Sequence, residues 1–396
     1  MSPGTGDVQE AVVPVRAIAF LALAAFASAA TMRITDALLP QIAREFDVTT
    51  GVAGRVVTAF AVSYGLMQAV FGPVGDRVGK YPVVTLATAL SGFGAAACAL
   101  APTLDALTVA RLLSGATAAA IIPLSMAWIG DTVPYAERQP VLARFLSGQI
   151  LGLVFGQAAG GILGESIGWH SAFWLIAALN ILAASGLGFE LACNARTRSG
   201  GRRGRSFAAG FHDVLSRPWA RVVLLTVLVE GYAMFGAFVF VASYLHDRFG
   251  LSLALSGVVV ASYGLGGLLY AATARRLLRA LHERGLALAG GVLLCVGFLA
   301  LALLPAWWLA VPVNVVLGLG FYMLHNTLQT HATQMAPEAR GAAVAMFAAA
   351  FFIGQSIGVA ATAAIVDTIG PRVAFVFAAV SVLALAAWFR GRLAHK

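Results

Sequence analysis

Four charged residues interrupt long apolar stretches of this sequence and are its best candidates for chemistry. Arg33 and Asp36 lie near the end of the first stretch, Arg111 lies in the fourth, and Glu230 lies midway along the seventh. A charge among apolar residues is costly unless it is paired, neutralised or in contact with water. A desolvated carboxylate can exchange protons near neutral pH, whereas a guanidinium stays protonated. Asp36 and Glu230 are therefore candidates for proton coupling, with Arg33 and Arg111 as their candidate partners.

Each of these residues also has a plainer interpretation. Arg33 and Asp36 stand at positions i and i+3, where they can form an ion pair on one helix face. A straight helix from Arg16 raises Asp36 by about 30 Å, which places this pair near the outer edge of the hydrocarbon. Arg111 can extend to the same edge, and Glu230 can be a packing residue that is protonated or paired. The sequence leaves these alternatives open.

The composition is that of a membrane protein. Of the 396 residues, 60% are hydrophobic and 11% are charged, whereas soluble domains carry about a quarter charged residues. The apolar stretches are about 20 residues long, as in membrane-spanning helices, and lack the alternation of β-barrel strands. Cys98, Cys193 and Cys295 lie in or beside apolar stretches without metal-ligand spacing. We therefore expect no metal and no cofactor.

Twelve apolar stretches predict an all-α membrane protein. We expect helices at residues 16–38, 51–73, 82–101, 105–129, 141–165, 171–191, 219–244, 255–274, 286–304, 308–331, 341–366 and 372–389. Between the sixth and seventh stretches lies a segment rich in arginine and glycine, which we expect to be a cytoplasmic linker without a fold of its own. The predicted domains are a six-helix bundle at 1–193, a linker at 194–218 and a second six-helix bundle at 219–396.

The placement of positive charge predicts the orientation in the membrane. Most Lys and Arg residues lie at the two ends of the chain, in the linker and in alternate loops, whereas Arg44, Arg55, Arg248 and Arg372 lie on the other side. Because basic loops are retained on the cytoplasmic side, both termini are expected to be cytoplasmic. The net charge of +9 therefore indicates contact with lipid headgroups, and we expect no nucleic-acid partner.

The two halves of the chain repeat each other. At an offset of 202 positions, Gly152 and Gly156 correspond to Gly354 and Gly358, in one register with matching Arg and Phe residues. Duplicated halves in parallel orientation are typical of transporters whose substrate site lies near the bilayer midplane, between bundles that rock against each other.

A short charged turn between the second and third stretches carries a motif. It contains Gly72, Asp76, Arg77, Gly79 and Lys80. This motif resembles the loop between helices two and three of the major facilitator superfamily, with Tyr81 in place of a second basic residue. Gly75 and Gly79 permit a tight reversal of the chain. We expect this turn to be a cytoplasmic gate, in which the Asp76 carboxylate accepts hydrogen bonds from backbone N–H groups near Gly341.

The fifth stretch carries glycines at four-residue spacing and one polar residue among them. They are Gly148, Gly152, Gly156, Gln157, Gly160 and Gly161. This spacing predicts close packing against another helix. The run resembles the fifth-helix motif of drug:proton antiporters of the arabinose and multidrug efflux type. Gln157 replaces the proline of that motif, which removes a kink and adds a polar group at a helix interface or the cavity. Arg111 and Gly115 resemble the Arg-x-x-x-Gly motif of the same superfamily.

The resemblance covers nearly the whole chain and implies a transporter, not an enzyme. It implies two pseudo-symmetric six-helix bundles, a monomer in the inner membrane of a bacterial-type cell, and proton-coupled efflux of small amphipathic molecules or drugs by alternating access. The open alternative is a proton-coupled symporter or facilitator for a small metabolite such as a sugar or an organic anion, which Arg33 and Arg111 would suit. Polar residues that can line the cavity, or instead join helices by hydrogen bonds, are Gln68, Gln149, Asn180, Tyr232, His325, Asn326, Gln329 and Gln355.

Overall fold

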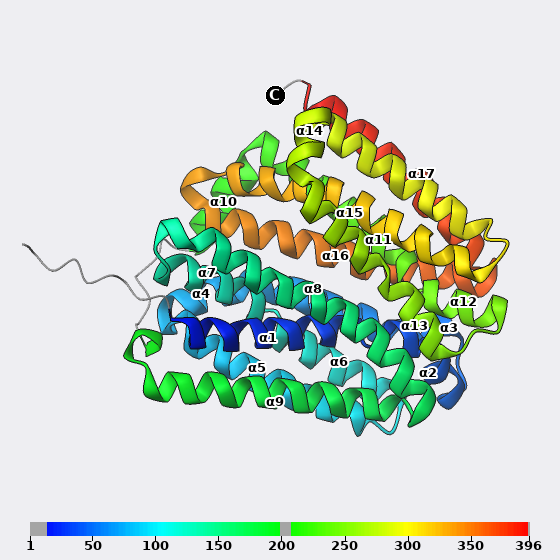
Figure 1. Ribbon diagram of the computed structural model, residues 1–396, viewed down its shortest axis with the longest axis horizontal. Coiled ribbons are helices and arrows are strands. Elements are labelled where there is room, and N and C mark those ends of the chain that lie inside the picture. The colour runs from blue at the N-terminus through cyan, green and yellow to red at the C-terminus, as the bar shows by residue number, and fades with distance from the viewer. Residues whose placement is uncertain (1–13, 199–206, 395–396) are drawn as a thin grey trace, which may run out of the picture.

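The computed structural model describes residues 14–198 and 207–394, and every regular element in these ranges is a helix. The first half contains α1 (Val15–Arg33), η1 (Asp36–Leu38), α2 (Leu39–Glu45), α3 (Thr50–Ala53), α4 (Arg55–Val78), α5 (Lys80–Ala99), α6 (Leu104–Ala118), α7 (Ile121–Thr132), α8 (Tyr135–Ser166) and α9 (Trp169–Cys193). The second half contains α11 (Pro218–Phe238), α12 (Val241–Phe249), α13 (Leu253–Ala261), α14 (Tyr263–Ala302), η3 (Trp307–Leu309), α15 (Ala310–Gln334), η4 (Pro337–Ala339), α16 (Arg340–Thr368) and α17 (Pro371–Arg392). Figure 1 shows the first half in blue to green below the second half in green to red.

These helices form twelve membrane spans. In the described part of the chain, 11 continuous helical stretches are long and apolar enough to cross a membrane. One of them, Leu253–Ala302, is 50 residues long and contains His282, whose backbone (φ 54°, ψ 174°) is not helical. This stretch therefore holds two spans joined at a sharp turn. The predicted all-α fold is confirmed.

Several spans are broken, and two of the breaks have an identifiable cause in proline. α6 ends at Ala118, and α7 begins at Ile121 with Pro123 in its first turn. α1 ends at Arg33, and a 3₁₀ turn leads to Pro40 at the start of α2. Proline lacks an N–H, so the carbonyl four residues earlier, on Ala119 or Asp36, loses its helical partner. The second break places Asp36 at the start of the 3₁₀ turn η1 instead of at the end of a straight helix.

The glycines of α8 pack directly against the first span. A Cβ atom added at Gly148, Gly152 or Gly156 would meet the carbonyl oxygens of Ala22, Phe26 and Ala30, respectively. Only a residue without a side chain permits this approach of two backbones. The close packing predicted from the glycine spacing is therefore found between α8 and α1.

The second half repeats this contact at the same offset. A Cβ atom at Gly354 of α16 would meet the carbonyl oxygen of Leu228 of α11, and one at Gly358 would meet that of Tyr232. All four positions lie 202 residues after their counterparts in α8 and α1. The repeat seen in the sequence thus corresponds to a repeated helix pair.

The segment between the halves is more ordered than the sequence analysis predicted. Within residues 194–218, α10 (Phe207–Ser216) is a helix and η2 (Ala195–Arg198) is a 3₁₀ turn. Val214 is fully buried, and the space at Gly210 is limited by the side chain of Ala342 of α16. The expectation of a segment without its own structure was wrong for α10, because its apolar face packs on the second half. Residues 199–206 lie outside the described residues.

The charged turn between α4 and α5 is shorter than expected. Gly75 is helical and packs against Leu124, so it takes no part in the reversal. Gly79 alone separates the two helices, with a φ of 108° that favours glycine. Asp76 lies 3.7 Å from the Nζ atom of Lys80, which also pairs with Asp131. In this structure, therefore, the carboxylate of the turn pairs with the lysine of the same turn.

The two halves meet at the end of the molecule away from the termini, which we call the distal end. The Asp367 carboxylate at the end of α16 accepts hydrogen bonds from the backbone N–H of Gly51 (2.9 Å) and the hydroxyl of Thr49 (2.6 Å). The Glu165 carboxylate at the end of α8 accepts one from the N–H of Ala254 in α13 (2.8 Å). Glu165 and Asp367 correspond at the repeat offset, so the same carboxylate contact crosses between the halves twice.

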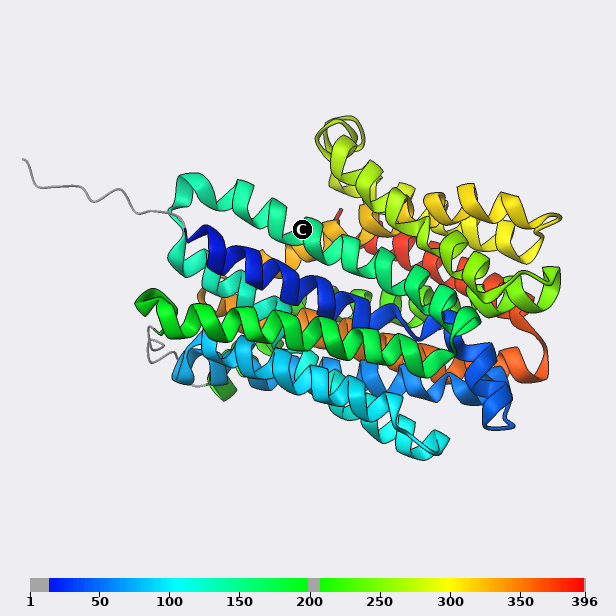
Figure 2. The same cartoon turned by 60° about the horizontal axis from the view of Figure 1, so that its bottom comes forward.

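At the opposite end, where α1 begins and α17 ends (Figure 1) and which we call the basic end, the halves separate. A Cβ atom built at Gly72 in α4 or at Gly341 in α16 would meet no atom of another helix within 4 Å. The Asp76 carboxylate pairs with Lys80, and among the described residues no hydrogen bond joins it to the start of α16 in this conformation. Figure 2 shows the first part of α14, in yellow-green, leaning away from the teal α8 toward this end. The molecule is closed at its distal end and opens toward its basic end.

Candidate functional site

A pocket lies between the halves, where they begin to diverge. Its lining residues come from α1 and α8 of the first half and from α11, α13, α14 and α15 of the second, and they are Arg33, Ile150, Leu153, Val154, Gln157, Phe235, Phe238, Val260, Ala261, Tyr263, Gly264 and Tyr322. About 430 Å³ within it is free of protein atoms, part of it open to solvent. A site made by both bundles changes shape when they move against each other.

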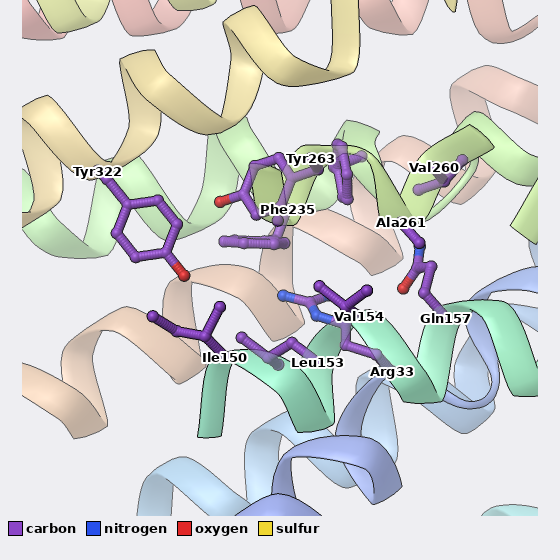
Figure 3. Close-up of a pocket in the computed structure, with 12 residues that line it drawn as sticks. Arg33, Ile150, Leu153, Val154, Gln157, Phe235, Val260, Ala261, Tyr263 and Tyr322 are labelled. Atoms are coloured by element: carbon purple, nitrogen blue, oxygen red, sulfur yellow. The ribbon is translucent and has the colours of Figure 1, made fainter. Parts of the chain in front are cut away.

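Arg33 is the charged residue in the wall of this pocket. Its guanidinium stacks on the ring of Phe235, 4.0 Å from the centroid, and donates a hydrogen bond of 3.4 Å to Asp36. Figure 3 shows the guanidinium beneath Phe235, extending toward the hydroxyl of Tyr322. Asp36 is fully buried behind Arg33, and its Oδ1 atom has no hydrogen-bond partner in the described structure. The predicted ion pair is present and is buried in the protein interior.

Two further polar groups of the pocket have few partners. The buried hydroxyl of Tyr263 forms no hydrogen bond with any described residue, and the buried amide of Gln157 interacts with the Asp36 carboxylate without a hydrogen bond of ordinary length from its Nε2 atom. Gln157 is 4% exposed and Tyr263 is 9% exposed. A buried polar group without a partner costs free energy, so such groups call for an explanation. Here both belong to the pocket lining.

Glu230 forms a second buried site in α11. Its side chain is fully buried, and its Oε2 atom lies 2.8 Å from Nδ1 of His325 in α15. Its Oε1 atom has no hydrogen-bond partner among the described residues. The sequence analysis offered Arg33 or Arg111 as the partner of Glu230, but the structure pairs it with a histidine. Histidine, unlike arginine, changes its charge near neutral pH.

Aromatic rings connect the Glu230–His325 pair to the pocket. The His325 ring stacks on Phe321 at 4.8 Å and lies 4.9 Å from Phe351. Both of these phenylalanines contact Phe235 of the pocket wall, at 5.3 and 5.7 Å. A continuous set of aromatic contacts therefore joins the pair to the pocket wall.

Arg111 lies outside the pocket and joins helices of the first half. It is 1% exposed and donates hydrogen bonds to the carbonyl oxygens of Thr31 (3.0 Å) and Val56 (3.4 Å). Its guanidinium also covers the ring of Phe60 at 4.3 Å. This geometry gives Arg111 a position that connects α6, α1 and α4, with carbonyl groups as the partners that a guanidinium in an apolar span requires.

The other polar candidates are dispersed. Asn180 is buried and donates to the Thr31 hydroxyl and the Ile176 carbonyl, and Asn326 donates to the carbonyl of Tyr322. Gln329 is exposed, whereas Gln68, at 6% exposed, and Gln355, at 1%, are buried. Gln149 and Tyr232 are partly exposed. Of the polar residues predicted to line a cavity or to form the fifth-helix motif, Gln157 is the one found in the pocket wall.

The aromatic residues of the pocket were not among the candidates predicted from the sequence. Phe235, Phe238, Tyr263 and Tyr322 line it, and none of them was a site candidate. Tyr263 follows Ser262 in a segment that repeats residues 63–66 of the first half. That repeat was the available signal, since equivalent positions of duplicated bundles lie at equivalent places in the interface.

A pocket between two pseudo-symmetric six-helix membrane bundles defines a secondary transporter, and comparisons with known proteins identify its family. A model described as Major Facilitator Superfamily matches residues 21–341 and 281–396. The chain therefore belongs to the major facilitator superfamily and is a multi-pass membrane transporter, not an enzyme.

Relatives of known name are distant. The chain is 26% identical over 351 residues to the inner membrane transport protein YdhP of Escherichia coli (strain K12), covering 88% of each chain. It is 28% identical over 351 residues to a chloramphenicol resistance protein of Streptomyces lividans, covering 86% of this chain and 87% of that protein. Its fold matches the crystal structure of a bacterial homolog of the human lysosomal transporter Spinster, in an inward-facing and unoccupied conformation, with a TM-score of 0.74 at 19% identity, over 96% of this chain and 97% of that one.

Proposed function

We propose that this transporter is a proton-coupled antiporter that exports small amphipathic molecules across an inner membrane. The basic end faces the cytoplasm in this proposal, because cytoplasmic loops of membrane proteins carry the excess of Lys and Arg. The conformation described above is then the one open to the cytoplasm. Export requires a second conformation in which the distal contacts open and the basic end closes.

The observation that carries the proposal is the environment of Glu230. A carboxylate that is fully buried in a membrane span, with one oxygen atom next to a histidine and the other without a partner, is costly to keep for packing alone. Carboxylate and imidazole side chains are groups through which proteins bind and release protons. Glu230 is therefore our first candidate for the coupled proton, and Asp36 is the second.

The direction of transport rests on the pocket and on one relative. The pocket has apolar and aromatic walls with a few polar groups, which suits a small amphipathic molecule. The relative from Streptomyces lividans is named as a chloramphenicol resistance protein, and export is one means of resistance. In the cycle that we propose, substrate enters from the basic end and leaves at the distal end, and protonation of the buried carboxylate on that side favours the return.

Flux in proteoliposomes tests the proposal. Purified protein is reconstituted and a pH gradient is imposed. The movement of radiolabelled chloramphenicol in the direction opposite to the proton flow is then recorded. Glu230→Gln should abolish gradient-driven flux but retain exchange of labelled for unlabelled substrate, since exchange needs no net proton movement. Glu338→Gln, at an exposed position in η4, is the matched control and should behave as wild type. Gradient-driven flux that persists in Glu230→Gln would reject Glu230 as the proton carrier.

A second function is favoured by Arg33, whose guanidinium in the pocket wall suits an anion. It is a proton-coupled symporter or a facilitator for a small metabolite such as a sugar or an organic anion. The two functions respond oppositely when the pH gradient is dissipated in cells. Cells with an exporter then retain more substrate, whereas cells with a symporter accumulate less.

A further inference from the structure

We propose that the pocket selects molecules with an apolar or aromatic body and a head group that accepts hydrogen bonds, either uncharged or anionic, and that it discriminates against cations. This inference deepens the proposed transport function and rests on it. It specifies the chemical class of the substrate, which neither the family nor the named relatives establish for this chain.

The polar groups that converge on the pocket are hydrogen-bond donors. Arg33 has donors only, and the hydroxyls of Tyr263 and Tyr322 and the amide of Gln157 can donate as well. The Tyr263 hydroxyl is buried without a partner in the described structure, whereas the Gln157 amide interacts with the Asp36 carboxylate. A ligand that accepts hydrogen bonds would satisfy the Tyr263 hydroxyl and remove the cost of leaving it unpaired. A ligand that only donates could form no hydrogen bond with Arg33.

The charges around the pocket point to the same class. Among the described residues, no carboxylate belongs to the lining, because Asp36 is fully buried and paired with Arg33, and Glu230 is fully buried beside His325. A bound cation would therefore meet the guanidinium before it met either carboxylate. Although the guanidinium is paired with Asp36, it would repel a cation placed at its open edge, and salt screens this repulsion less in a partly buried site than at the surface.

The apolar walls accommodate the body of the ligand. The ring of Phe235 already covers one face of the Arg33 guanidinium, which leaves its edge for a hydrogen-bonding partner. Ile150, Leu153 and Val154 of α8 lie opposite, as Figure 3 shows. A molecule with its head group at Arg33 and its ring between α8 and the aromatic residues of the second half would contact both bundles. The affinity for such a ligand would therefore depend on the relative position of the two bundles.

Three compounds with one carbon skeleton test the inference. 4-Phenylbutyrate is anionic, 4-phenylbutyramide is an uncharged acceptor, and 4-phenylbutylamine is cationic near neutral pH. Their dissociation constants are measured by calorimetry on the full-length protein in detergent, without a pH gradient. We expect the acid and the amide to bind at least about tenfold more tightly than the amine, since one charge-assisted hydrogen bond is worth about that factor.

Variants assign the preference to the pocket. Arg33→Gln should abolish the advantage of the acid over the amine. Tyr263→Phe, which removes one oxygen atom, should weaken binding of the amide about fivefold. Arg55→Gln and Tyr270→Phe are the matched controls, because Arg55 pairs with Asp105 outside the pocket and Tyr270 lies further along α14. Both controls should bind all three compounds as the wild type does.

The outcomes separate this inference from the proposed function. Three results would each overturn the inference. The first is tighter binding of the amine than of the amide, and the second is a preference for the acid over the amine that survives Arg33→Gln. The third is no binding of any compound at 10 mM, which is roughly the weakest affinity that one or two hydrogen bonds provide. None of these results concerns proton coupling, because no gradient is present. Loss of gradient-driven flux with the binding preference intact would instead reject the exporter and keep the substrate class.

Discussion

The repeated carboxylate contacts at the distal end should hold the transporter in the conformation described here. Glu165 accepts a hydrogen bond from Ala254 N–H, and Asp367 accepts hydrogen bonds from Gly51 N–H and Thr49. A hydrogen bond to a charged group contributes about 1.5–3 kcal/mol when buried, but both carboxylates are exposed to solvent and screened. We therefore assign each contact about 0.5–1 kcal/mol, and about 1–2 kcal/mol to the two together.

Glu165→Ala with Asp367→Ala should shift the equilibrium between the two conformations toward the one open at the distal end by about 5- to 30-fold, since about 1.4 kcal/mol corresponds to a factor of ten. Ala37→Cys, in a background without native cysteines, is the reporter, because Ala37 is fully buried and packs against Gly257 of the other half. The rate at which a membrane-impermeant maleimide labels it should rise by the same factor.

The matched control for this experiment is Asp105→Ala. Asp105 pairs with Arg55 at the same end of the molecule, at 2.5 Å, but both residues belong to the first half. Its loss should leave labelling of the reporter unchanged. Equal labelling of the double variant and the wild type would refute the reasoning, because the contacts would then contribute nothing to closure.

Three more predictions follow from the site and the packing. Asp36→Asn, assayed beside Glu230→Gln, should keep proton-driven flux if Glu230 carries the proton, and loss of flux in Asp36→Asn alone would transfer that role to Asp36. Arg111→Lys should lower stability by about 2 kcal/mol, seen as a lower melting temperature in detergent, because lysine cannot reach two carbonyl groups with one planar fork; an unchanged melting temperature would contradict this. Gly152→Ala should cost about 1–3 kcal/mol, because its methyl group would overlap the carbonyl of Phe26, whereas Gly130→Ala, with nothing within 4 Å of the added atom, should be neutral or slightly stabilising.

Most of the architecture follows from local sequence patterns. Twelve apolar stretches, the 202-residue repeat and the glycine spacing of α8 predicted the spans, the duplicated bundles and one close helix contact. These features are readable because hydrocarbon thickness fixes the length of a span and because close backbone contact in lipid demands small residues. The course of α10 and the one-residue turn at Gly79 depended on packing against other helices, so the sequence analysis described them incorrectly.

The sequence predicted only part of the site, and the reason is physical. The sequence by itself determined that Asp36, Glu230, Arg33 and Arg111 are unusual, because a charge in an apolar span is costly whatever surrounds it. Only the tertiary structure decided their partners: Arg111 is bound to two carbonyls, Arg33 faces the pocket, and Glu230 lies beside His325, 95 positions away in the chain. Whether a segment spans the membrane depends on its own residue types. The partner of a side chain depends instead on the rotation of each helix about its own axis, which is set by contacts between helices distant in sequence.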